Sequence, residues 1–485
     1  MSDSKQNTVC IIGGGMSGLI TGALLARNGY KVTVLEKNHI IGGGLQSFRR
    51  GDAVFNTGMQ AFAGYGENFA FEHYWRYLGI DIQSLNFFPY DSAAQEIVWV
   101  DKKHRYKLPK TRKAYTQYLI DQFPNQREGI LKLMTCIYEI GNTFDYFWLR
   151  PKQIHPEAAE YGIITASQLI KKYITDERLA RLFEYVGMHL GYNLSILPST
   201  ELGMILNLYI EGGWRIAGGN ISLADKLADF IIAHCGEVLN NSEVCNVEES
   251  NGEIISVSTA DGRVVIADKY VCAISPKAFV QLSKSDFFRE STKQRIKEYQ
   301  NDSSCCICHI KLKENSFPFQ NHMIFMPALR YDEYLPRYIS MITPLERNQG
   351  EWASTMEILS FTHYKDFEKW NNTYTGDRGN DYLNVKREIA QEIIDHVCQY
   401  YPKLKHSIDQ IYLSTPLTIR DYFANPLGAT YGQQGVFIPI KTKSRNLFMT
   451  GQSVQYQGLF GVMITSILTS EIILGRSLIE EIAKV

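Results

Sequence analysis

The chain has 485 residues, of which 45% are hydrophobic and 21% charged, and its formal net charge is −1. This length allows two or more layered domains around a large core. The near-neutral charge gives no electrostatic reason to expect a nucleic-acid partner, and we predict none.

The sequence also bears on location. Its start, MSDSKQNTVC, lacks the basic and apolar segments of a secretory signal. No apolar run approaches the roughly 20 residues that span a bilayer. The nine cysteines are scattered along the chain, which is typical of a reducing compartment. We therefore expect a cytoplasmic protein, with a peripheral position on the inner membrane face left open.

Residues 9–36, VCIIGGGMSGLITGALLARNGYKVTVLE, have the pattern of a dinucleotide-binding fingerprint. The expected elements are a strand, a helix and a second strand, at 9–12, 19–28 and 31–35. The first turn carries G-x-G-x-x-G, formed by Gly13, Gly15 and Gly18. Such glycines allow a tight turn, close approach to a pyrophosphate and close helix–strand packing. Glu36 can accept hydrogen bonds from both hydroxyls of a ribose, which favours FAD or NAD over NADP.

Three further stretches favour FAD. The segment 40–48, IIGGGLQSF, and the segment 56–62, NTGMQAF, follow the fingerprint closely. Near the end, residues 446–475 predict a strand, a turn at Gly451 and a helix that begins near 458–461. The N-terminus of that helix could face the pyrimidine edge of a flavin and stabilise negative charge there.

The middle of the chain predicts both nucleotide-domain and substrate-domain elements. Residues 220–238 predict an amphipathic helix and a strand, and 243–276 predict strands joined at Asn251-Gly252 and Asp261-Gly262. Amphipathic helices are predicted over 129–149 and 381–401. Their aromatic spacing favours core packing, with a lipid tunnel as the alternative.

Two polar stretches each allow a structural interpretation and a functional one. The stretch 101–113, DKKHRYKLPKTRK, is basic and predicts a solvated hairpin, or a patch that touches anionic lipid headgroups. The run CCICH at 305–309 lacks the ligand spacing of a zinc site. We interpret it as part of a buried strand and predict no metal.

At this point the sequence resembles the FAD-dependent phytoene desaturase, carotenoid isomerase and retinol saturase family, within the wider amine oxidase-like flavoprotein superfamily. The resemblance is strong over 8–65, 218–231 and 414–475, and weak over 90–210 and 285–405. It implies that the first glycine turn and the acid after the second strand hold ADP, that the second glycine segment runs along the pyrophosphate and flavin, and that the C-terminal motif meets the ring. The implied cofactor-binding residues are Gly13, Gly15, Met16, Ser17, Gly18, Glu36, Lys37, Gly43, Gly44, Leu45, Gln46, Met59, Val244, Gly451, Gln452, Gly461 and Val462.

The chain departs from the family pattern at three positions. Gly44 and Gln452 stand where the superfamily often has an arginine and an acid, and Gln60 stands where the retinol saturase branch commonly has a histidine. No Cys or His occurs over 40–72 or after His406, so we expect noncovalent FAD.

The resemblance implies an α/β fold with a discontinuous, Rossmann-like FAD-binding domain of the GR2 type and a second, substrate-binding domain of mixed sheet and helices. The FAD-binding domain is expected over 1–80, 211–284 and 411–485. The substrate-binding domain, with a helical lid, is expected over 81–210 and 285–410.

The predicted function is an FAD-dependent oxidoreductase that desaturates or saturates carbon–carbon bonds of a hydrophobic polyene or isoprenoid. The alternatives are a cis–trans isomerase that uses reduced FAD without net redox, a flavin amine oxidase, and a non-enzymatic prenyl carrier of the same fold. Gln60, Tyr431 and Tyr456 are the candidate catalytic residues because they are close to flavin motifs in the sequence. The electron donor or acceptor and the catalytic acid or base stay open.

Overall fold

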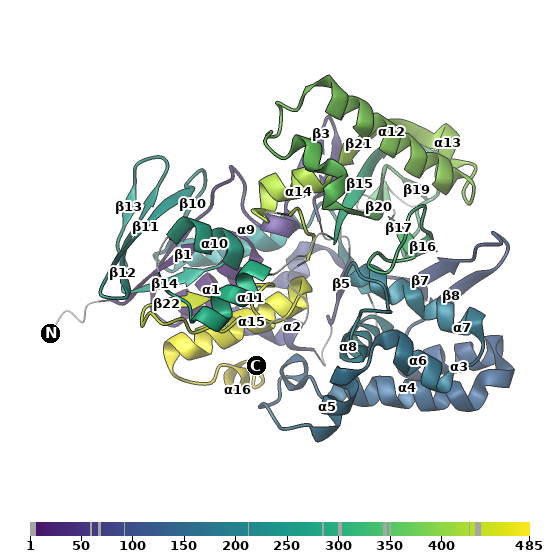
Figure 1. Cartoon of the computed structure of the whole chain (residues 1–485), viewed down its shortest axis with the longest axis horizontal. Helices are drawn as coiled ribbons and strands as arrows, with labels where there is room; N and C mark the ends of the chain where they lie inside the picture. Colours follow the sequence, from purple (N-terminus) through teal and green to yellow (C-terminus); the bar gives the residue numbers. More distant parts are fainter. Residues whose placement is uncertain are drawn as a thin grey trace.

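The computed structural model describes residues 6–58, 61–65, 69–91, 93–211, 213–283, 286–298, 303–342, 347–348, 351–425, 427–431 and 438–485. Met59 and Gln60, two of the predicted site residues, lie outside this part of the chain. Within it, a parallel sheet at the left of Figure 1 stands opposite a mixed sheet and a helical layer at the right.

The parallel sheet has five strands in the order β10-β2-β1-β14-β22. Their bounds are Glu237–Leu239 (β10), Lys31–Leu35 (β2), Thr8–Ile12 (β1), Lys269–Cys272 (β14) and Leu447–Met449 (β22). All four neighbouring pairs run parallel. The predicted strands at 9–12 and 31–35 are confirmed, and a strand near the end of the predicted 243–276 region, β14, pairs with β1 in this sheet.

Both faces of the parallel sheet are covered, which explains its nearly continuous apolar strands. In β1, Val9 and Ile11 face a cluster that includes side chains of the covering helices, while Cys10 and Ile12 face a second cluster, because successive strand residues point to opposite faces. The helices are α1 (Met16–Arg27), α9 (Ile221–Ala233) and α15 (Gly458–Leu474). The opposite face is covered by the strands β11 (Val244–Ser250), β12 (Glu253–Thr259) and β13 (Val264–Val265) and by the helix α10 (Pro276–Ser283).

The mixed sheet has seven strands in the order β21-β15-β20-β17-β16-β7-β8. Their bounds are Ile408–Ser414 (β21), Ser303–Leu312 (β15), Thr355–His363 (β20), Tyr338–Ile342 (β17), Met323–Pro327 (β16), Ala93–Val98 (β7) and Arg105–Pro109 (β8). One face packs on α12 (Gly379–Cys398) and α13 (Leu404–Ser407). The CCICH run lies in β15, where Cys305, Cys306 and Cys308 are buried, as the interpretation as a strand predicts.

The helical layer at the lower right of Figure 1 lies beside the mixed sheet. It consists of α3 (Arg112–Gln122), α4 (Arg127–Asn142), α5 (Pro156–Ile163), α6 (Ala166–Tyr173), α7 (Glu177–Leu182) and α8 (Ser199–Ile210). The 3₁₀ segment η5 (Phe183–His189) lies between α7 and α8 in the chain. The helix predicted over 129–149 is wrong beyond Asn142, where a separate 3₁₀ turn, η4 (Asp145–Trp148), begins. The buried Asp145 carboxylate fixes this turn by accepting hydrogen bonds from the Gln153 backbone N–H at 2.7 Å and from His155 at 2.9 Å.

The remaining elements are short. They are the hairpin β3 (Ser47–Arg50) and β4 (Ala53–Asn56), the sheet of β5 (Phe62–Ala63), β9 (Gly213–Ile216) and β6 (Phe87–Pro89), the pair β18 (Arg347–Asn348) and β19 (Trp352–Ala353), the helices α2 (Ala70–Leu78), α11 (Glu290–Glu298), α14 (Pro416–Phe423) and α16 (Ile479–Ile482), and the 3₁₀ turns η1 (Gly43–Leu45), η2 (Ile82–Leu85), η3 (Pro124–Gln126) and η6 (Tyr364–Trp370).

The predicted domain boundaries stay a prediction. The boundary between 410 and 411 falls inside β21, and β6 and β9 pair across the boundaries predicted at 80 and 210. Among the residues that the structure describes, no helix is long and apolar enough to cross a membrane, and no cluster of three or more His, Cys, Asp or Glu side chains could hold a metal.

Candidate functional site

A cavity of about 680 Å³ runs from the first glycine turn, at the parallel sheet, to η5 and α8 beneath the mixed sheet. It therefore reaches residues that are far apart in the sequence. Fifteen of the predicted cofactor-site and catalytic residues line it: Gly13, Gly15, Met16, Ser17, Glu36, Lys37, Gly43, Gly44, Leu45, Val244, Tyr431, Gly451, Gln452, Gly461 and Val462.

The first glycine turn is held by contacts that leave no room for side chains. The Gly13 N–H donates to the Leu35 carbonyl at 2.8 Å, which ties the turn to β2. A Cβ added to Gly18 would lie 2.0 Å from the Gly13 carbonyl oxygen. Gly15 caps α1 without any side-chain hydrogen bond, so the positive end of the helix is presented to the cavity by backbone N–H groups alone.

Glu36 lies at the C-terminal end of β2 and is 6% exposed. One carboxylate oxygen accepts from the Gly14 N–H at 2.9 Å, and the other accepts from the Asn38 N–H at 2.8 Å. Burial raises the pKa of Glu36, and these backbone hydrogen bonds act against that rise. Each oxygen keeps lone pairs for further donors, so the carboxylate can still bind a pair of hydroxyls.

The second glycine segment lies against the first. Gly42 donates from its N–H to the Gly14 carbonyl at 2.9 Å. Gly43 has a φ of +55°, and a Cβ there would lie 3.2 Å from the Gly15 Cα. The two backbone segments thus form a cradle that only small residues can build.

The segment after β2 is fixed to α14, which explains why the 414–431 stretch belongs with the site. Lys37 donates from Nζ to the Asp421 carbonyl at 2.5 Å, and the Asn38 side chain donates to the Tyr422 carbonyl at 3.0 Å. The next residue, Phe423, lies against the second glycine segment and against Gly58. Its ring would be 4.0 Å from a Cβ at Gly44 and 3.3 Å from a Cβ at Gly58.

The C-terminal motif closes the cavity from the other side. Ser17 faces Gly451, where an added Cβ would lie 3.1 Å from the serine oxygen. The Ser466 hydroxyl of α15 donates to the Ser17 carbonyl at 3.2 Å and so joins α15 to α1. Gln457 precedes α15 and lines the cavity, and its Oε1 is buried with no hydrogen-bond partner in the described part of the chain.

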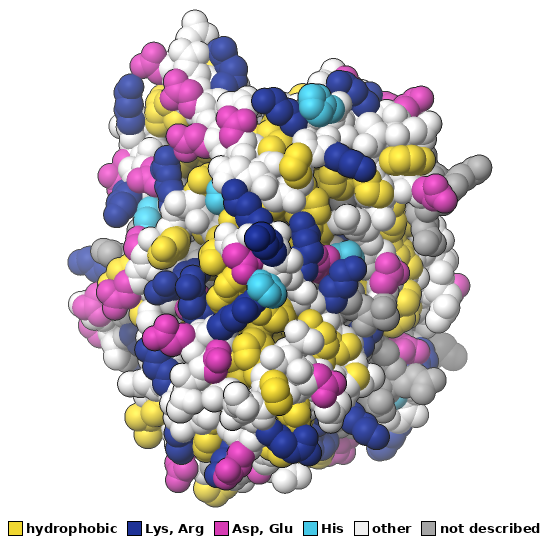
Figure 2. All heavy atoms as spheres, turned by 90° about the vertical axis from the view of Figure 1, so that its right-hand side faces the viewer, with side chains coloured by type: hydrophobic (Ala, Val, Ile, Leu, Met, Phe, Trp, Pro, Cys, Tyr) yellow, Lys and Arg dark blue, Asp and Glu magenta, His cyan; other side chains and the backbone are white. Residues whose placement is uncertain are grey.

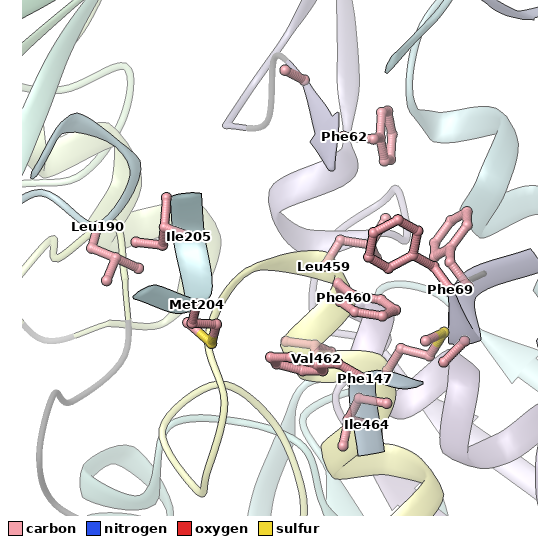
Figure 3. Packing of buried hydrophobic residues seen from close by; sticks show 14 of the residues in the cluster. Phe62, Phe69, Phe147, Leu190, Met204, Ile205, Leu459, Phe460, Val462 and Ile464 are labelled. Carbon is pink, nitrogen blue, oxygen red and sulfur yellow. The ribbon is translucent and has the colours of Figure 1, made fainter. Parts of the chain in front are cut away.

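The inner part of the cavity, hereafter the chamber, is apolar and aromatic. Figure 3 shows Leu190, Met204 and Ile205 on one side of it and Phe62, Phe460 and Val462 on the other. Phe147 from η4 packs on Phe460 with ring centroids 4.8 Å apart. The chamber walls are Ala61, Phe62, Phe71, Phe147, Met188, His189, Leu190, Met204, Ile205, Leu208, Tyr209, Met323, Phe325, Leu359, Tyr431 and Phe460.

The charged and polar groups of the cavity are segregated. Among the described lining residues, the charged ones are Glu36, Lys37 and Glu243. All three lie at the end of the cavity where β2 ends and β11 begins. The chamber has His189, Tyr209 and Tyr431 instead. Burial raises the pKa of both tyrosines, so their phenols stay neutral.

Some predicted residues do not line the cavity. Gly18 contacts the first turn, and Gln46 donates from its side chain to the Ile40 carbonyl at 2.8 Å, so both support the cradle from behind. Tyr456 packs on Phe147 with ring centroids 5.5 Å apart, and burial raises its pKa to about 12. Sequence reasoning missed Phe147, His189 and Tyr209, which belong to no motif, and Phe423, which lies within the 414–475 stretch but was given no role.

Comparisons with known proteins show the family of the chain. A model of the family "Flavin containing amine oxidoreductase" matches residues 16–473. The chain is similar to the all-trans-retinol 13,14-reductase of Danio rerio, with 23% identity over 96% of this chain and 86% of that protein. It is also similar to the chloroplastic prolycopene isomerase of Daucus carota, with 24% identity over 95% of this chain and 76% of that protein.

Among solved structures, an oxidoreductase from Methanosarcina mazei has the same fold, with a TM-score of 0.69 and 15% identity over 96% of this chain and 100% of that chain. The family match over residues 16–473 confirms the predicted membership of the amine oxidase-like superfamily.

Proposed function

Because the chain belongs to the family of flavin-containing amine oxidoreductases, whose cofactor is FAD, we propose that it saturates or desaturates carbon–carbon bonds of an apolar polyene. The observation that carries this proposal is the single cavity, in which a glycine-built cradle opens into a chamber of apolar and aromatic side chains.

The residues fit FAD on three observations. A Cβ on Gly43 would lie 3.2 Å from the Gly15 Cα, so the cradle is walled by bare backbone. A pyrophosphate can therefore approach this backbone closely. Glu36 keeps lone pairs for the ribose hydroxyls. The unpartnered Oε1 of Gln457 at the start of α15 can accept from an N–H of the ring system.

We assign the cofactor accordingly. The turn at Gly13–Gly18 and the segment Gly43–Gln46 hold the pyrophosphate, while Glu36 and Val244 hold the adenosine. Met59, Gly451, Gln452, Gly461 and Val462 are assigned to the flavin and ribityl. Binding is noncovalent, since the segments next to the ring carry no Cys or His.

The domain arrangement follows the same assignment. The five-stranded sheet forms the discontinuous FAD-binding domain of GR2 type, over 1–80, 211–284 and 411–485. The seven-stranded sheet and helices α3–α8 form the substrate-binding domain, over 81–210 and 285–410. Moving the boundary at 410 to the end of β21 keeps the seven-stranded sheet whole.

When bound, FAD supplies the hydride chemistry. The chain's own residues bind and orient the polyene, and the chamber excludes water because its walls are apolar. Tyr431 lines the chamber as a neutral phenol, so it can hold a proton for a carbon that becomes saturated. Gln60 and Tyr456 are left as weaker assignments, the first because it lies outside the described residues and the second because it does not line the cavity.

The apolar character of the chamber supports a polyene over an amine. A protonated amine buried there would lose its hydration with no carboxylate beside it, because the charged residues among the described lining residues, Glu36, Lys37 and Glu243, lie at the cradle. The similarity to a retinol reductase and to a prolycopene isomerase supports the same substrate class. The likeness to the isomerase makes isomerisation with reduced FAD the second candidate.

Single turnover under anaerobic conditions tests the proposal. The purified yellow protein is reduced, and all-trans-retinol is added in detergent. Reappearance of the 450 nm absorption together with loss of one double bond supports saturation, and bleaching of the oxidised protein by the polyene supports desaturation. A changed isomer ratio with unchanged flavin absorption indicates the isomerase, and a colourless protein that takes up no FAD would contradict all three.

We also propose contact with an anionic membrane surface through the β7–β8 hairpin. Lys102, Lys103, Arg105 and Lys107 are exposed there, and Figure 2 shows Lys and Arg side chains near the middle of the face that contains this hairpin. Sedimentation with vesicles that contain phosphatidylserine, but not with neutral vesicles, is expected, and K102E/K103E should weaken it. A reducing compartment is proposed with it, since all nine cysteines are unpaired.

A further inference from the structure

His189 is a polar side chain in the wall of the apolar chamber. It ends η5, lines the cavity and is 9% exposed. Its ring stacks on Tyr209 of α8, with centroids 3.8 Å apart and planes 25° from parallel. The Phe325 ring meets it edge-on, with ring centroids 5.7 Å apart. These contacts fix the plane of the imidazole.

A second contact selects the tautomer. The Gln95 side-chain nitrogen lies 3.2 Å from His189 Nε2. Because an amide nitrogen donates, Nε2 accepts, and the ring hydrogen resides on Nδ1. No residue in the described part of the chain is hydrogen-bonded to Nδ1. Burial lowers the pKa of His189 to about 3, so the ring is neutral at physiological pH.

The surroundings decide which group this N–H can receive. A carboxylate in the chamber would lose its hydration without a cation nearby, because Lys37 is the one cation among the described lining residues and it lies at the cradle. A pure hydrocarbon would leave the Nδ1–H buried and unpaired, which is unfavourable. A neutral oxygen acceptor meets both conditions.

We infer that His189 is a specificity-determining residue, whose Nδ1–H donates to a hydroxyl or carbonyl oxygen at one end of the polyene. The inference rests on the proposed function and adds that the substrate is a polyene with a neutral oxygen group. Gln95 is its positioning residue, since it selects the tautomer.

The preference of the site for an oxygenated polyene over its deoxygenated analogue should be large for a single hydrogen bond. A site built to pair a ligand oxygen rejects the analogue that lacks it, because the buried donor is then left without a partner. We expect the oxygenated ligand to bind about 10-fold to 100-fold more tightly than its deoxygenated analogue.

The test compares all-trans-retinol with axerophthene, the same polyene without its hydroxyl. Both are titrated in detergent into the oxidised, FAD-loaded protein, and binding is followed by the change in the flavin spectrum, so turnover is not needed. The wild type should prefer retinol, and His189→Phe, which keeps a stacking ring, should erase the preference while axerophthene binds as before or more tightly.

Two further variants separate this role from a structural one. Gln95→Leu should reduce the preference without removing it, because the ring hydrogen can then occupy either nitrogen, and it serves also if His189→Phe does not fold. His234→Phe is the matched control, since the His234 ring stacks on Phe230 with centroids 4.0 Å apart but is exposed at the C-cap of α9, and it should leave the preference unchanged.

Equal affinity of the wild type for the two ligands, or a preference that survives in His189→Phe, would overturn the inference and leave the proposed function standing. Absence of binding by either polyene to flavin-loaded wild type would overturn the proposed function, and this inference with it.

Discussion

The cradle and the chamber are two ends of one cavity, but they are built in different ways. The cradle consists of backbone from short, contiguous segments, such as Gly13–Gly18 and Gly42–Gly44, and its neighbours within the chain fix it. The chamber consists of side chains from η4, η5, α8, β16, β20 and α15, which are brought together only by the fold. Mutations in the cradle should therefore act on cofactor retention, and mutations in the chamber on substrate binding and turnover.

The strongest way to break the cradle is Gly18→Ala. The new Cβ would lie 2.0 Å from the Gly13 carbonyl oxygen, so the turn must shift and its N–H groups lose their positions. We expect FAD affinity to fall by more than about 100-fold, so that almost no flavin absorption stays with the protein after gel filtration, since each 1.4 kcal/mol lost is tenfold in affinity.

Gly162→Ala is the matched control for that change. Gly162 is exposed in α5 and has nothing within 4 Å of the added Cβ, so its flavin content should equal that of the wild type. Equal loss of flavin in both variants would show that the fall reports general instability rather than the cradle.

Glu36→Arg should have the next largest effect. It removes the carboxylate that accepts the Gly14 and Asn38 N–H groups and places a cation where ribose hydroxyls are assigned. Charge-assisted hydrogen bonds contribute about 2–3 kcal/mol, so FAD affinity should fall about 100-fold. Dialysis against decreasing FAD measures it, with Glu237→Arg, on the exposed edge strand β10, as control. Wild-type flavin occupancy in Glu36→Arg would refute the assignment of Glu36.

Tyr431→Phe tests the chamber without touching the cradle. If the phenol supplies the proton for saturation, kcat should fall about 100-fold while flavin content stays constant. Because burial raises the pKa of Tyr431, the phenol is protonated at and below its ordinary pKa, so activity should not decline from this group between pH 6 and about 9.

Tyr456→Phe removes a hydroxyl that does not line the cavity and should leave kcat unchanged. If the two variants lose activity equally, Tyr431 has no special part in proton transfer.

Phe147→Ala should have the smallest effect of the four. It removes the ring that packs on Phe460 at the chamber wall, so KM for the polyene should rise about tenfold with flavin content maintained. Phe367→Ala, which truncates a ring of similar burial in the cluster behind the mixed sheet, is the control for lost stability. A KM that rises equally in both would place Phe147 outside the substrate site.

The same contrast explains what the sequence reveals. Gly13, Gly43 and Glu36 could be recognised because a tight turn, a close backbone approach and an acid at a strand end each require particular residues at fixed spacing. The parallel strands and α15 could be predicted for the same reason, from local apolar pattern and turn residues.

The chamber could not be predicted in this way. Phe147 falls within the long helix predicted over 129–149, and only the contacts of Asp145 with Gln153 and His155 place it on a separate turn at the cavity. His189 has no motif around it, and its role depends on Gln95 and Tyr209, which come from a strand and a helix elsewhere in the chain.

The most direct test of the account is a titration of the yellow, oxidised protein with all-trans-retinol in detergent, followed in the flavin absorption band. If one cavity holds both FAD and the polyene, the flavin spectrum should change and saturate at one polyene per flavin, and acid precipitation should then release all of the FAD into solution. A protein that carries FAD but whose spectrum is unchanged by any concentration of the polyene would contradict the claim that cradle and chamber form one site.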